Sequence, residues 1–164
     1  MNKLILAAIV ACCVQMSVSA NQIGYAWTFS ELASRSDIVV IAAWVRTTDT
    51  GIKTTITENI SPGLPAVEMN TDFKVLTIFK GNGSLSPITL VHYRLDMDRI
   101  RGVCLNCGTH LDFGNGPVYL LFLKQDPDGR YRPTSGQVFP DSSVMVLPKN
   151  GVTLDLDPYL LVNR

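Results

Sequence analysis

The chain has 164 residues, with 14 basic and 14 acidic side chains, and charged residues make up only 17% of it. This length suits a single domain. No block of like charge occurs, so the composition offers nothing that would recruit nucleic acid or an anionic membrane surface, both of which select basic clusters. With so few charged side chains, we expect the polar contacts of this chain to rest on Ser, Thr, Asn and backbone groups.

The first twenty residues have the three parts of a secretory signal peptide. Lys3 supplies a positive charge, Leu4–Val14 is an almost unbroken apolar run, and Val18-Ser19-Ala20 presents small residues to a signal peptidase. The run is shorter than the roughly 20 residues that a membrane-spanning helix needs. We therefore expect cleavage between Ala20 and Asn21 and a secreted or periplasmic protein.

Lipidation is an alternative fate for the N-terminus. Ile9-Val10-Ala11-Cys12 resembles the bacterial lipobox, in which a small residue precedes a cysteine that is acylated. A chain acylated at Cys12 would be anchored by lipid in the cell envelope, without any membrane span after removal of the signal.

The first predicted element of the mature chain is a short helix over Phe29–Arg35. Thr28 and Glu31 have the spacing of a capping box, with a hydroxyl at the N-cap and a carboxylate three residues later. The pattern predicts about two turns, ending before Ser36.

Three apolar segments predict strands that are covered on both faces, fully or in part: Ile38–Val45, Thr71–Lys80 and Val118–Lys124. Between the first two, Thr47–Thr57 predicts a turn and a returning ribbon, and residues 61–65 predict an exposed loop.

Ile88–Met97 alternates and predicts a strand with one wet face. Its pattern predicts Val91, Tyr93, Leu95 and Met97 on the buried side, and His92, Arg94, Asp96 and Asp98 on the wet side.

A tight turn at residues 126–129 should lead into a return arm at Arg130–Thr134. Short edge strands or loops are expected at Val144–Leu147 and Val152–Leu156. With five main strands and no helix long enough for a crossover, we predict an all-β, antiparallel barrel or sandwich with one short N-terminal helix. Segments that are apolar on both faces favour the barrel.

Four segments in order resemble the netrin-module and tissue-inhibitor-of-metalloproteinase (TIMP)-like superfamily, as seen in secreted bacterial proteins. They are Ser36–Ile41, Phe73–Gly81, Cys107–Gly114 and Tyr119–Leu123. The resemblance implies an OB-like five-stranded barrel. It covers most of a single domain at residues 21–164, with a core at about 29–136 and a C-terminal extension at 137–164.

The chain departs from that superfamily at its cysteines. Eukaryotic inhibitors of the superfamily begin with a mature cysteine that chelates the zinc of the protease, whereas cleavage after Ala20 leaves Asn21 at this position. Protease inhibition is therefore not carried over. The family cysteine matching Cys107 often pairs with a C-terminal one, and no cysteine follows Cys107 here.

The pair Cys104 and Cys107 is the motif with the clearest chemical implication in the sequence. In an exported protein a local disulfide between them is expected, because thiols oxidise in that compartment. Two alternatives remain open: a thiol–disulfide switch, and a metal site formed by Cys104, Cys107 and His110, with His92 as a fourth ligand.

The predicted function is a non-catalytic binding module with an unknown extracytoplasmic partner and no cofactor. OB-type barrels bind on an exposed sheet face and in adjoining loops. By this fold-level analogy the candidate binding residues are His92, Tyr93, Arg94 and His110. The alternatives are a redox-active or metal-binding envelope protein and a structural envelope lipoprotein.

Overall fold

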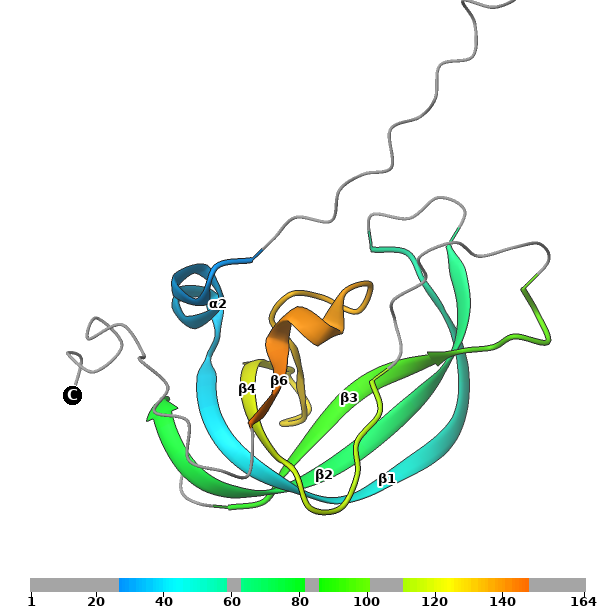
Figure 1. Cartoon of the computed structure of the whole chain (residues 1–164). Coiled ribbons are helices and arrows are strands. Elements are labelled where there is room, and N and C mark those ends of the chain that lie inside the picture. Colours follow the sequence, from blue (N-terminus) through cyan, green and yellow to red (C-terminus); the bar gives the residue numbers. More distant parts are fainter. Residues whose placement is uncertain (1–26, 59–62, 82–85, 101–110, 148–164) are drawn as a thin grey trace, which may run out of the picture.

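The computed structural model describes residues 27–58, 63–81, 86–100 and 111–147. This part of the chain is mostly β, with one short α-helix (Figure 1). The elements in chain order are α2 (Phe29–Arg35), β1 (Ile38–Ile56), β2 (Leu64–Lys80), β3 (Ile88–Leu95), β4 (Val118–Gln125), β5 (Tyr131–Pro133), the 3-10 helix η1 (Pro140–Ser143) and β6 (Val144–Leu147).

The strands form one mixed sheet in the order β1-β2-β3-β5-β4-β6, and β1 also pairs with β4, which closes a ring of five strands. The antiparallel prediction holds for every pair except β3 and β5, which are parallel at Leu90 and Tyr131. Strand directions cannot alternate all the way around a ring with an odd number of members. One parallel neighbour is therefore a consequence of closure.

Strand β1 is longer than the sequence pattern predicted. The predicted ribbon at Thr47–Thr57 is instead mostly the second half of β1, which continues to pair with β2 as far as Ile56 and Leu64. The register of this pair shifts at four places along β1. Such irregularities bend a strand and increase its twist, so one long strand can turn away from β4 while keeping β2 as its partner.

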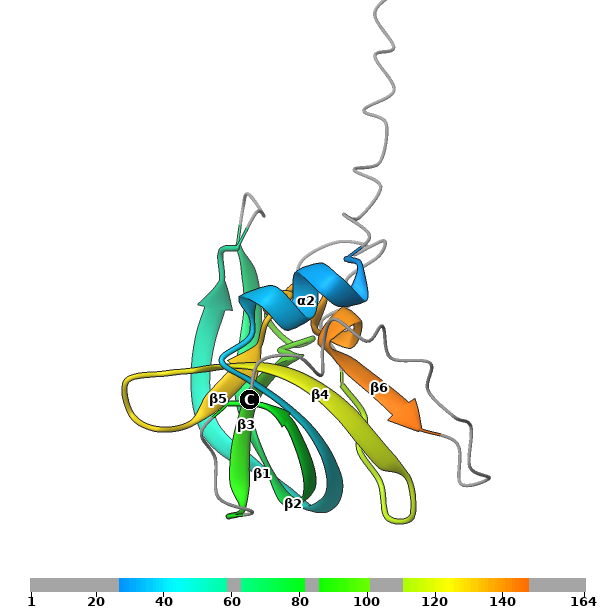
Figure 2. The ribbon, with the colours of Figure 1, turned by 90° about the vertical axis from the view of Figure 1, so that its left-hand side faces the viewer.

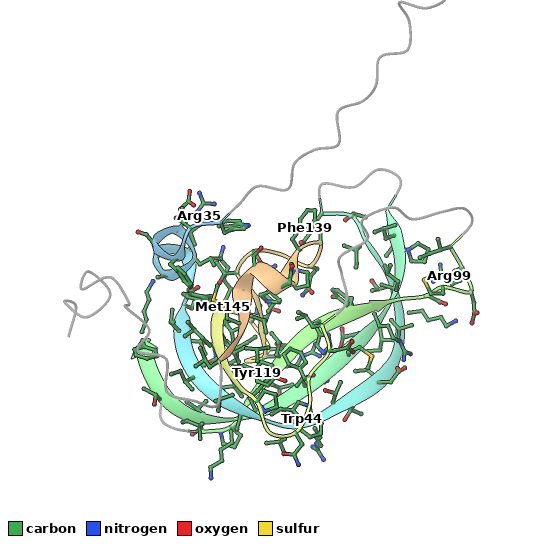
Figure 3. The ribbon with its side chains drawn as sticks, viewed as in Figure 1. Arg35, Trp44, Arg99, Tyr119, Phe139 and Met145 are labelled. Atoms are coloured by element: carbon green, nitrogen blue, oxygen red, sulfur yellow. The ribbon has the colours of Figure 1, made fainter. Side chains whose placement is uncertain are left out.

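The main core fills the interior of the ring. Its fully buried side chains come from all four long strands, with Leu111 added from the segment before β4. Phe73 and Phe113 pack edge to face at 5.0 Å, and Tyr119 lies against both rings. Figure 3 shows Tyr119 near the centre of the molecule. The predicted β4 segment is confirmed as a strand that is buried on both faces.

A second apolar layer lies between the ring and α2. Leu32 and Ala33 of the helix pack with Val39, Leu120 and Phe122, and β6 adds Met145 and Leu147. Figure 2 shows α2 lying across one end of the strands. The predicted capping box is present: the Glu31 amide donates to Thr28 Oγ1 at 3.2 Å, and Glu31 Oε2 accepts from the Thr28 amide at 2.9 Å.

Lys80 fixes the C-terminal end of α2 to the sheet. Its ammonium group donates to the carbonyl oxygens of Ala33, Ser34 and Ser36 at 2.7–3.1 Å. A cation at the last turn of a helix satisfies carbonyls that have no partner inside the helix. The end of β2 therefore holds the helix in place as well as pairing with the start of β1. Within the described residues no helix has the length and apolarity needed to cross a membrane.

The wet-face prediction for β3 is wrong at two positions. His92 and Asp96 are buried, with exposures of 2% and 6%, whereas Met97 on the predicted inner side is 68% exposed. The side of β3 that carries Ile88, Leu90 and His92 faces the ring interior. Alternation in the sequence marked two distinct faces of β3, but ring closure decides which one faces the ring interior.

Part of the predicted C-terminal extension belongs to the fold. Val144–Leu147 forms β6, as predicted, and pairs with Val118–Leu121 of β4. Val138 packs with Ile56 and Ala66 in a small third core at the far end of the β1–β2 ribbon. The segment between β5 and η1 therefore covers the side of β3 that does not face the ring interior.

Candidate functional site

The three consecutive candidates His92, Tyr93 and Arg94 do not form one site. Successive residues of a strand point to opposite faces, and β3 follows this rule. His92 lies in the ring interior, Tyr93 lies on the opposite face, and Arg94 is an exposed side chain paired with Asp49 at 2.7 Å.

His92 is part of a buried polar chain. Its Nε2 lies 2.9 Å from Thr71 Oγ1, which lies 2.8 Å from Thr47 Oγ1, and Thr47 also accepts from the Trp44 indole at 3.0 Å. The imidazole packs edge to face on Phe113 at 5.3 Å. These contacts assign His92 a structural place in the core.

Tyr93 lines a pocket of about 190 Å³ on the face of β3 opposite the ring interior, here called the Tyr93 pocket. The end of β1, the middle of β3, the β4–β5 hairpin and the segment after β5 contribute to its walls. The lining residues are Thr54, Thr55, Ile56, Thr57, Glu58, Val91, Tyr93, Asp126, Arg132 and Gln137.

Gln137 is the most deeply buried polar residue of the pocket lining. It is 6% exposed, and its side-chain nitrogen donates to the Val91 carbonyl at 3.2 Å. Its side-chain oxygen is buried and accepts no hydrogen bond within the described residues. A buried acceptor without a partner costs about 1–3 kcal/mol. Because Gln137 and Val91 both line the pocket, this uncompensated acceptor lies directly behind the pocket wall.

Glu58 brings a carboxylate to the same wall. One of its oxygens, Oε2, accepts from the Gln137 amide at 2.6 Å. A Cβ added at Gly136 would lie 2.6 Å from the same oxygen, and Gly136 has a φ of +90°. The backbone conformation therefore favours glycine at position 136, and any larger side chain there would also displace the Glu58 carboxylate.

The arginines near the pocket are already engaged by acids. Arg132 pairs with Asp126 at 3.0 Å, and Arg130 pairs with Glu68 at 2.7 Å and with Asp128 at 2.8 Å. Arg130 also donates to Asn70 at 3.1 Å. Together with Glu58, these groups are four carboxylates and two guanidinium ions, so acidic charge is in excess on this face.

The hydroxyl of Tyr93 is affected by this excess. Burial is the main reason that the pKa of Tyr93 is raised, and the nearby carboxylates of Glu68, Glu58 and Asp126 raise it further. Both effects disfavour the phenolate. Tyr93 therefore stays a neutral hydroxyl, able to donate or accept, at every physiological pH.

Several predicted sites lie outside the described residues. These are the cleavage site at Ala20 and Asn21, Cys12, the pair Cys104 and Cys107, and His110. Among the residues that the structure does describe, no group of three or more histidine, cysteine, aspartate or glutamate side chains is arranged to hold a metal ion.

Of the pocket residues, only Tyr93 was among the sequence candidates. Asp126 was interpreted as part of a turn, and Gln137 as the start of an extension; the two are 11 positions apart and meet only because the segment after β5 folds back over β3. No short spacing in the sequence marks this arrangement. Comparison with protein-family models and with curated proteins finds no match to this chain.

Proposed function

We propose that this chain is an exported, non-catalytic binding module whose binding site is the Tyr93 pocket. The observation that carries the proposal is a pocket that brings Glu58 and Tyr93 together in front of the buried, uncompensated carboxamide oxygen of Gln137. Buried polar groups in proteins nearly always have partners, and an exception directly beside a pocket is a reason to expect a ligand there.

The size of the pocket supports binding of a single chemical group. Pockets for drug-sized ligands measure roughly 300–1,000 Å³, and an apolar cavity of about 150 Å³ holds one benzene. A pocket of about 190 Å³ lies between the two. It suits one side chain or one end group of a larger partner better than a complete metabolite, which favours an interaction module over an enzyme.

The composition of the lining also supports a non-catalytic role. The residues that line the pocket include no cysteine, serine or histidine, and its one aspartate is paired with Arg132. Its threonine and tyrosine hydroxyls would need a base within hydrogen-bond reach to act as nucleophiles, and within the described residues no hydrogen bond joins any of them to Glu58 or Asp126. The lining offers hydroxyls, a carboxamide and carboxylates, which are binding groups.

We further propose that the five-strand ring is an OB-like barrel of the TIMP/netrin-module type and that export follows cleavage after Ala20. The closed strand order supports the first proposal, because the OB-fold is a five-stranded, partly open barrel that binds ligands on a sheet face and in adjoining loops. The Tyr93 pocket lies on such a face. The signal-peptide pattern of the first twenty residues supports the second proposal.

Thermal unfolding with small probes tests the binding site. A ligand that binds only the folded state raises the midpoint, so we would screen an amine, a guanidine, a carboxylate, a neutral amide and a sugar. At least one class should raise the midpoint of the unaltered protein but not of Thr54→Trp, whose indole fills the pocket.

The matched control is Thr48→Trp, an exposed position of the same strand outside the pocket. It should keep the full shift. If no class raises the midpoint, or if Thr54→Trp responds like the unaltered protein, the Tyr93 pocket is not the binding site.

A further inference from the structure

We infer that the Tyr93 pocket takes a protonated aliphatic amine, such as the end of a lysine side chain. The inference rests on the proposed function and names the chemical class of its ligand. It follows from three properties of the pocket: an excess of acceptors, an excess of negative charge, and a volume suited to one small group.

Acceptors exceed donors in the lining. The nitrogen of the Gln137 carboxamide is used by the Val91 carbonyl, so this side chain offers a ligand only its oxygen. The oxygen itself is buried, so it reaches a donor in the pocket only when the carboxamide turns about its broad terminal torsion and releases the Val91 carbonyl. Within the described residues Glu58 accepts only from the Gln137 amide, through one oxygen. The other oxygen of Glu58 is available to a donor.

The charge of the lining selects a cation. Asp126 and Arg132 neutralise each other at 3.0 Å, which leaves Glu58 as the uncompensated charge of the pocket. Arg130 does not supply the missing positive charge, because it is held by Glu68 and Asp128. An anionic ligand would meet Glu58 without a free cation among the lining residues, so it is disfavoured.

The ammonium group fits the remaining requirement. It has three N–H donors and no acceptor. The pocket offers a Glu58 oxygen and the Tyr93 hydroxyl as acceptors, with Gln137 Oε1 as a third once its carboxamide has turned. Its aliphatic stem can lie along Ile56 and Val91, which line the same pocket. Long basic side chains commonly bury the stem and satisfy the charged end separately.

Calorimetric titration of the purified protein tests the inference with two sources of the same chemistry. The probes are the blocked peptide acetyl-Gly-Lys-Gly-amide and free 1,4-diaminobutane, and the control peptide carries norleucine in place of lysine. We expect binding with a Kd on the order of 1 mM or tighter for at least one amine and none for norleucine. Binding of the peptide alone indicates a partner protein, and binding of the diamine alone indicates a free amine.

Two matched variants locate the effect. Glu58→Gln should weaken amine binding about tenfold or more, because it removes the charge that assists the hydrogen bond. Asp98→Asn, an exposed carboxylate outside the pocket, should leave the affinity unchanged. Equal losses in both variants, or equal binding of the norleucine peptide, overturn the inference.

Failure of the inference can be told apart from failure of the proposed function. If a carboxylate, amide or sugar stabilises the protein through the pocket while neither amine binds, the binding module stands and the ammonium assignment is wrong. If no probe of any class acts through the pocket, both are wrong.

Discussion

The end of the molecule next to α2 and the end farthest from it are built differently, although β1 and β2 run through both. Near α2, β1 and β4 are covered on both faces by the ring interior and by the helical layer. At the end farthest from α2, β1 and β2 carry threonines and charged side chains over a core of only a few residues. Figure 3 places Arg35 and Arg99 at the two ends.

The difference shows how one sheet combines an apolar end that stabilises the fold with a polar end that has only a small core. Burial of large apolar side chains near α2 stabilises the fold, since each contributes roughly 1.5–3 kcal/mol. At the far end the strands instead hold polar groups in place, including the acceptors of the Tyr93 pocket. Functional sites commonly keep such uncompensated groups, and the rest of the fold offsets their cost.

The largest effect is expected from a truncation in the doubly covered region. Phe122→Ala should lower the free energy of unfolding by about 3–5 kcal/mol, because it opens a cavity between β4 and α2. Val138→Ala in the small far core should lower it by about 1–2 kcal/mol. Urea unfolding measures both. Equal losses would show that the two ends are equally packed.

The next largest expected effect is a difference in stability between variants of His92 and Arg94, two residues of β3 that the sequence placed on one wet face. His92→Ala should cost about 2–3 kcal/mol, because it leaves a cavity beside Phe113 and removes a partner of Thr71. Arg94→Ala should cost less than about 1 kcal/mol, as exposed ion pairs do. If Arg94→Ala proves the more destabilising in urea unfolding, His92 does not lie in the core.

A smaller effect tests how firmly α2 covers its end of the ring. Thr28→Ala removes the N-cap hydroxyl and should cost about 1 kcal/mol. Ser34→Ala, an exposed position of the same helix, should change stability by no more than about 0.5 kcal/mol. Thermal unfolding compares the two variants, and a Thr28→Ala midpoint equal to that of Ser34→Ala would contradict the capping box.

The smallest expected effect is a pH-dependent change in stability at Asp72, which lies near the middle of β2, between the two ends of the molecule. A hydrogen bond from Thr89, and then one from Arg46, lower the pKa of Asp72 below its ordinary value of 3.8. A lowered pKa means stability that is fully present above about pH 4 and is lost as the pH falls through the folded-state value.

Asp72→Asn should therefore be less stable than the unaltered protein at pH 7, by less than about 1 kcal/mol because Arg46 is largely exposed. The difference should shrink at acid pH. Urea unfolding of both proteins at pH 7 and at an acid pH below about 4 checks this. A stability difference that grows toward low pH would show that the carboxylate does not stabilise the fold.

The sequence predicted the apolar end of the molecule well. The capping box at Thr28 and Glu31 and the strand at Val118–Lys124 are confirmed, because each depends on local pattern alone. Val144–Leu147, expected as a short edge strand or a loop, is a strand. The path of β1 beyond Thr47 was predicted incorrectly. Its threonines resemble a turn locally, and only pairing with β2 makes them a strand.

The candidate site was predicted only at Tyr93. Alternation along β3 separated its two faces correctly, but both are covered, one by the ring interior and the other in part by the segment after β5. Glu58 and Gln137 are 79 positions apart and meet through a backbone amide. Contacts of that kind leave no periodic signal, so the pocket emerges only from the three-dimensional fold.

The proposed function places binding at the Tyr93 pocket, on the face of β3 opposite the ring interior. Amide chemical shifts measured by NMR during titration with acetyl-Gly-Lys-Gly-amide test it most directly. We predict the largest shifts at Thr54–Glu58, Tyr93 and Gln137, with little change at Val39–Ala42 and Leu120–Leu123. The largest shifts at those apolar segments, or none at the Tyr93 pocket at a saturating peptide concentration, would contradict the account.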